Sequence, residues 1–97
     1  MKLVTKLTKG SNYRFDFRVE VTSDEMAAIS RAGLESHRIY CGGWHASVRQ
    51  LLDGHHFECE DMLSVQAVEV DVQQAAQQIK YLLQTVDRFG ETKEREI

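Results

Sequence analysis

The 97 residues are 42% hydrophobic and 28% charged, a composition that indicates one folded domain and excludes a disordered or fibrous chain. The formal net charge of −3 argues against a nucleic-acid binder driven by electrostatics alone, because phosphate contacts need clustered lysine and arginine. No apolar run approaches the roughly 18 residues that span a bilayer, and two cysteines do not make a disulfide framework. We therefore expect a cytoplasmic protein without a membrane segment.

The first predicted element is a strand over residues 12–22, where large apolar and charged side chains alternate. The apolar positions are Tyr13, Phe15, Phe17, Val19 and Val21. Because the other face is charged throughout, the sheet should be covered on one side only, with antiparallel neighbours.

A helix is predicted next, over residues 24–36. Thr22 and Glu25 stand at capping-box spacing before it, and its apolar stripe is narrow. Residues 37–43, which include Cys41 and two glycines, are expected to form a turn or a short irregular link. A second short helix is predicted over 44–53, with Gly54 as its C-terminal stop.

Two strands are predicted over residues 56–61 and 64–71. In both, apolar side chains alternate with acidic ones, and a hairpin turn is expected near Asp61 and Met62. Residues 1–20 carry a charge balance of +3 and residues 58–71 one of −5. If these segments are neighbouring strands, Arg14 and Arg18 should face acidic partners across the sheet.

The last predicted element is a long amphipathic helix, with Asp71 as N-cap and apolar residues at three- and four-residue spacing through Arg88. Gly90 should end it, so that residues 1–90 form one domain and 91–97 a charged mobile tail. The outer face of this helix is largely uncharged and is the candidate partner-binding surface. Its members are Gln73, Gln74, Gln77, Lys80 and Gln84.

These elements predict an α+β fold: a small single domain whose three-stranded, mostly antiparallel sheet is covered on one face by helices. The predicted order is β-α-α-β-β-α. A sheet that ends in an uncovered edge strand would favour a homodimer by edge pairing.

All four histidines and both cysteines lie between His37 and Cys59. Cys41, His45, His55 and Cys59 have the ligand types of a tetrahedral zinc site, at the spacing C-x3-H-x9-H-x3-C. A helix over 44–53 would hold His45 and His55 about 15 Å apart, which opposes one shared metal. The alternative is ordinary polar histidines and a core Cys59. A further alternative is a Cys41 nucleophile at a helix N-terminus, although no third orienting group accompanies it.

The order strand, helix, helix, strand, strand, helix is similar to that of type I KH domains, which bind single-stranded nucleic acid. The resemblance covers most of the chain as an order of elements. The gripping G-x-x-G loop of that family is absent, because no two glycines here stand three apart and Gly42 and Gly43 are adjacent. No functional residue is therefore carried over.

The leading functional hypothesis is a non-enzymatic interaction protein that binds a macromolecular partner, most readily a protein, without a cofactor. A small acidic domain of this kind is typical of phage or mobile-element accessory proteins that inhibit a host factor. The alternatives are a small zinc-stabilised domain that uses the His37–Cys59 window and a weak KH-like binder of single-stranded nucleic acid.

Overall fold

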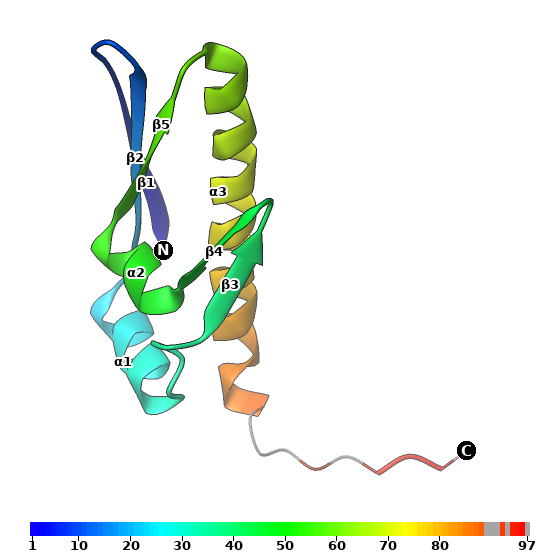
Figure 1. The fold of residues 1–97 in the computed structure, drawn as a ribbon. Coiled ribbons are helices and arrows are strands. Elements are labelled where there is room, and N and C mark those ends of the chain that lie inside the picture. Colours follow the sequence, from blue (N-terminus) through cyan, green and yellow to red (C-terminus); the bar gives the residue numbers. More distant parts are fainter. Residues whose placement is uncertain (89–91, 93, 97) are drawn as a thin grey trace.

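A computed structural model describes residues 1–88, 92 and 94–96 (Figure 1). The fold is α+β, as predicted, with a three-stranded antiparallel sheet, a second sheet of two strands and three helices. The elements are, in chain order, β1 (Lys2–Lys9), β2 (Tyr13–Glu20), α1 (Ser23–Arg31), β3 (Arg38–Cys41), β4 (Trp44–Ser47), α2 (Val48–Asp53), β5 (His55–Cys59), α3 (Met62–Thr85) and the 3-10 turn η1 (Val86–Arg88). No helix in the described part of the chain is both long and apolar enough to cross a membrane.

The larger sheet has the order β1-β2-β5, with antiparallel pairing throughout. The predicted strand over 12–22 is confirmed as β2, the central strand, whose Phe15, Phe17 and Val19 are buried while Arg14 and Arg18 are exposed. The predicted strand over 56–61 is confirmed as β5, which starts one residue earlier.

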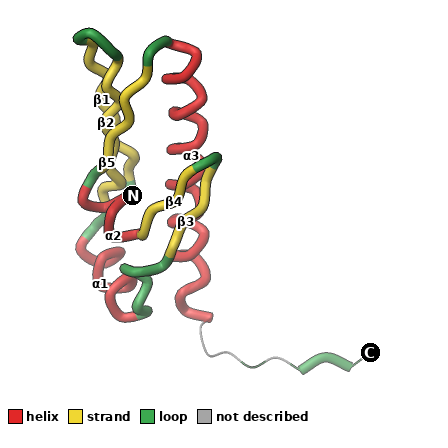
Figure 2. The backbone as a smooth tube through the Cα atoms, in the orientation of Figure 1, coloured by secondary structure: helices red, strands yellow, loops and turns green. Residues whose placement is uncertain are grey.

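The long helix α3 lies along the apolar face of this sheet (Figures 1 and 2) and supplies Val65, Val72, Ala75, Ala76 and Ile79 to the core. The opposite face of the sheet carries the charged residues of β2. Arg14 lies opposite Glu58 of β5, as the charge pattern predicted, but its ion pair is with Asp16 of its own strand. Arg18 lies opposite Val4 of β1, so the acidic partner predicted for it across the sheet is wrong.

Helix α1 is confirmed at its start, since Thr22 and Glu25 form both hydrogen bonds of a capping box. It ends at Arg31 rather than Ser36. The chain leaves the helical conformation at Gly33, whose φ of +68° favours glycine.

The link predicted over 37–43 and the first part of the helix predicted over 44–53 are wrong. Strands β3 and β4 form a hairpin there that lies across α3 (Figure 1). Ile39, Cys41 and Ala46 are buried while Tyr40 and His45 are exposed, which is the two-residue period of a strand. Helix α2 begins only at Val48, because Ser47 and Gln50 form a second capping box.

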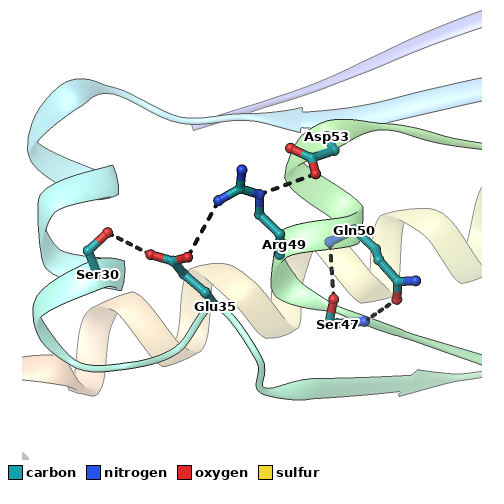
Figure 3. Close-up of polar contacts among 6 residues, drawn as sticks. All are labelled: Ser30, Glu35, Ser47, Arg49, Gln50 and Asp53. Atoms are coloured by element: carbon teal, nitrogen blue, oxygen red, sulfur yellow. Dashed lines mark hydrogen bonds and ion pairs between the residues drawn. The ribbon is translucent and has the colours of Figure 1, made fainter.

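A polar cluster holds α1 and α2 together at one end of the molecule (Figure 3). Glu35 accepts a hydrogen bond from the Ser30 hydroxyl at 2.8 Å and meets the Arg49 guanidinium at 3.5 Å. Arg49 also pairs with Asp53, four residues further along α2, at 3.2 Å. These exposed contacts fix the orientation of the short helices more than they stabilise the fold.

The strand predicted over 64–71, the hairpin at Asp61 and Met62 and the N-cap at Asp71 are also wrong. A single helix of 24 residues begins at Met62, with Asp61 as N-cap accepting a hydrogen bond from the Ser64 amide at 2.8 Å. Val65 and Val72 stand seven residues apart and both are buried, so packing against the sheet selects the helical period.

Strand β1 was not predicted, because its lysines and neighbouring Leu3 and Val4 follow neither period. It pairs with β2 along its whole length. At the other end of the chain, Thr92 and residues 94–96 are exposed and outside regular secondary structure. The predicted stop at Gly90 and the remaining tail positions 91, 93 and 97 lie outside the described residues, so the domain boundary stays a prediction.

Candidate functional site

The outer face of α3 is the surface in which charge is most depleted. All five predicted partner-binding residues are exposed there, namely Gln73, Gln74, Gln77, Lys80 and Gln84. Among the exposed residues of Met62–Thr85, Lys80 is the only charged one. Charged residues are depleted from the centres of protein interfaces, so this face has the composition of a contact surface.

Large apolar side chains also lie on this face, and they were not among the predicted partner-binding residues. Tyr81 is 66% exposed and Val70 53%, and Leu63 near the start of the helix is 78% exposed. Leu63, Val70 and Gln77 follow at seven-residue intervals, with Tyr81 four residues later. This signal was hidden because Val70 had been assigned to the inner face of a strand.

A shallow groove runs between α3 and the β3–β4 hairpin. One part, of about 310 Å³, is lined by His37, Ile39, Gln77, Gln78, Tyr81 and Leu82. The neighbouring part, of about 560 Å³, is lined by Val70, Gln73, Gln74, Gln77 and Gln78. Gln77 and Gln78 line both parts, and every residue that lines the second part belongs to α3. Tyr40 of β3 has its backbone carbonyl beside Gln78 of the groove. Its side chain is 68% exposed and lies on the face of β3 opposite to that of the buried Ile39.

Hydrogen bonds from α3 hold the hairpin that forms the groove's side. The Gln78 side-chain amide donates to the Tyr40 carbonyl at 3.0 Å, and the Cys41 thiol donates to the Asp71 carbonyl at 2.8 Å. The turn residue Gly42 packs against the Asp71 carboxylate. The position of Tyr40 relative to the glutamines is therefore fixed by contacts within the domain.

Burial raises the pKa of the Cys41 thiol, and the nearby Asp71 carboxylate raises it further. Cys41 is also in β3, seven residues before the start of α2, so the predicted location at a helix N-terminus is wrong. A protonated, buried thiol is a poor nucleophile. Cys41 instead contributes to packing between the hairpin and α3.

The four predicted zinc ligands are not brought together. Cys41 is buried against α3, and His45 is exposed on β4 with its Nδ1 atom 3.2 Å from the Arg38 guanidinium. His55 and Cys59 are at opposite ends of β5 in the other sheet. In the described ranges, no group of three or more His, Cys, Asp or Glu side chains is arranged to hold a metal ion.

A further hollow, of about 370 Å³, lies on the charged face of the sheet. Its lining includes Lys6, Arg14, Asp16, Arg18 and His56. Arg14 pairs with Asp16 and Arg18 with Glu20, at 3.2 and 3.1 Å. Because the arginines are already neutralised, the hollow does not present them to an anionic ligand.

The observed order, β-β-α-β-β-α-β-α, differs from the one on which the similarity to KH domains was based. The segment between α1 and α2 contains the β3–β4 hairpin rather than a nucleic-acid-gripping loop. No protein-family model, curated protein or solved structure matches the chain.

Proposed function

We propose that this domain is a non-enzymatic interaction module that binds a protein partner through the outer face of α3 and the adjoining groove. One observation carries the proposal: an exposed helical face with a single charged residue also carries Val70 and Tyr81 beside a groove. Tyrosines are enriched at positions that dominate protein interfaces, and glutamines supply hydrogen bonds without the desolvation cost of full charges.

The partner would contact Tyr81, which is 66% exposed and lines the groove together with Gln77 and Gln78. The hairpin is held to α3 by hydrogen bonds, so the backbone beside the groove does not have to be ordered on binding. Such preorganisation lowers the entropic cost of association.

We also place the protein in the cytoplasm, since Cys41 and Cys59 are both free thiols. Inhibition of a host factor, as expected of a phage or mobile-element accessory protein, is one form that such binding takes. An activity assay on a captured partner enzyme, with and without this protein, tests for inhibition.

A photo-reactive amino acid at Gln77 tests the proposed surface directly. Irradiation in lysate should give a covalent adduct with a discrete protein, while the same amino acid at Arg18, on the charged face of the sheet, should give none. An adduct that disappears after nuclease treatment would instead support the single-stranded nucleic-acid alternative. Equal labelling from both positions would contradict a specific surface.

Substitution of the exposed tyrosine provides the matched affinity test. Tyr81→Ala should weaken binding of the captured partner about tenfold or more, without a change in melting temperature, because the side chain is largely in solvent. Arg18→Ala, at a residue that is also exposed but lies on the charged face of the larger sheet, should leave affinity unchanged. An unchanged Kd for Tyr81→Ala would remove the residue from the interface.

A further inference from the structure

A second surface is formed by β1, and it involves none of the residues of the α3 face. Strand β1 lies at the end of the order β1-β2-β5 and pairs only with β2 among the described residues. Its eight residues, KLVTKLTK, contain no proline or glycine. Native edge strands are protected by proline, bulges or charges, and here lysines are the only such protection.

The lysines of this edge are not neutralised within the sheet. Lys2 lies opposite Glu20 and Lys6 opposite Asp16 in the antiparallel register. Both acids are instead paired with arginines of their own strand, Arg18 and Arg14. Of the ion pairs in the described part of the chain, none includes Lys2 or Lys6. The edge therefore presents two ammonium groups on one face, each opposite an acid that is already paired with an arginine.

The other face of the same strand carries Leu3 and Leu7, together with Thr5 and Lys9, and it is incompletely covered. Leu7 lies directly opposite Phe15, yet Leu7 is 42% exposed and Phe15 only 2%. Leu3, on the same side of the strand, is partly buried against the core. The apolar layer thus continues to the edge of the sheet, where one more strand would cover it.

We propose that β1 is a docking edge for an extended acidic segment of another protein, which adds to the sheet as a fourth strand. Backbone hydrogen bonds along the edge would supply affinity, as in other cases of strand addition. Aspartate or glutamate at alternate positions would face Lys2 and Lys6, and apolar residues between them would cover Leu7. The proposal is independent of the α3 surface.

A second copy of β1 fits this edge less well than an acidic segment does. Antiparallel pairing of two copies can place Leu3 opposite Leu7, but it also gathers Lys2 and Lys6 of both chains on one face. Like charges at neighbouring cross-strand positions are destabilising. An acidic strand supplies the same backbone pairing and apolar contact, and it also neutralises the lysines.

The test uses two capped ten-residue peptides, one alternating glutamate with valine and one alternating lysine with valine. Amide NMR spectra and hydrogen exchange of the full chain report where each peptide binds. The acidic peptide should shift and protect amides of Lys2–Lys9, and its affinity should fall with salt. Binding of both peptides with similar affinity, or shifts confined to α3, would overturn the proposal.

Charge variants sharpen this test. Lys6→Glu should weaken binding of the acidic peptide about tenfold or more. Lys6→Gln provides a second variant if the first loses its thermal transition. Arg31→Glu is the matched control, because it makes the same charge change on the exposed surface of α1, outside both proposed surfaces, and should leave peptide binding intact.

The same experiment also tests two other molecules that could bind at the β1 edge, a second copy of the chain and a nucleic acid. Light scattering that gives a dimer, with β1 amides protected in the absence of peptide, would overturn the proposal in favour of a second copy. Competition by a single-stranded oligonucleotide as effective as that by the acidic peptide would overturn it in favour of a general polyanion site. Failure of any of these tests leaves the cross-linking result at Gln77 unaffected.

Discussion

At the scale of single residues, three glycines differ in backbone conformation and in steric contact, so the effect of each factor on stability can be measured separately. Gly33 and Gly42 both have positive φ, of +68° and +57°, but only Gly42 has a neighbour where a Cβ atom would stand. That neighbour is the Asp71 carboxylate of α3. Gly43, the next residue, has neither a positive φ nor a contact within 4 Å.

Alanine at each of these glycines should therefore give three graded results. Gly43→Ala should leave stability unchanged, and Gly33→Ala should cost about 1 kcal/mol through its left-handed backbone alone. Gly42→Ala should cost more than Gly33→Ala, because the Asp71 carboxylate must also move out of the way. Urea denaturation measures all three. Equal losses at positions 33 and 42 would show that the Asp71 carboxylate moves aside freely.

At the scale of elements, α3 depends on its N-cap. The backbone amide of Ser64 donates to the Asp61 carboxylate and lowers the pKa of that group below its ordinary value of 3.8. The unfolded state then binds more protons in acid, so this contribution to stability rises with pH. This contribution is fully present when the pH is above the ordinary pKa of the Asp61 carboxyl group. It is lost as the pH falls through the lowered pKa of that group in the folded state.

Asp61→Asn isolates this titration, because asparagine is also a good N-cap but does not ionise. Compared with the original chain, the variant should lose less melting temperature between neutral pH and pH about 3. Glu25, whose pKa is lowered chiefly by its hydrogen bond from the Thr22 amide, titrates in both chains and cancels in the comparison. Identical acid profiles would exclude Asp61 as a source of the pH dependence.

The elements that could be predicted are those in which one local signal has no competitor. Strand β2 has nine residues of uninterrupted alternation, and α1 has a capping box. Strand β1 could not be predicted because its pairing with β2, rather than its own pattern, makes it a strand. Residues 44–47 were assigned to a helix because Trp44, Val48 and Leu51 share helical spacing, although the Ser47–Gln50 capping box starts the helix later.

Part of the candidate surface could be predicted, again because a clear local pattern marks it. The glutamines and Lys80 lie in the half of α3 whose period is clear, and all five are exposed as expected. Tyr40 was missed because exposure on a hairpin depends on which face α3 covers, a tertiary fact. The candidate zinc set was chosen by residue type and spacing, and the structure divides its members between the two sheets.

At the scale of the whole molecule, α3 joins both sheets into one core. Ile79 and Leu82 both lie on its apolar stripe, but Ile79 is 1% exposed whereas Leu82 is only partly buried beside the groove. The structure therefore places the centre of the core at Ile79.

Truncation of these two side chains should reflect that difference. Ile79→Ala should cost about 2 to 5 kcal/mol of unfolding free energy, the range for a well-packed core position, and Leu82→Ala should cost less. Tyr81→Ala, between them in sequence but exposed, should stay within about 0.5 kcal/mol of the original chain. Chemical denaturation compares the three, and a larger loss at Leu82 would place the core's centre nearer the groove.

The sequence of the N-terminal half of α3 affects how the protein aggregates when its fold is damaged. Residues 65–72 have valine at four of eight positions and satisfy a two-residue and a helical period equally well. Valine favours strands over helices, so this stretch is helical because β2 and β5 cover Val65 and Val72. When that cover is lost, the same residues form a short, proline-free, β-prone segment. We therefore expect damage to the sheet to expose this stretch to self-association, with Glu69 and Asp71 as the only charges within it that oppose the process.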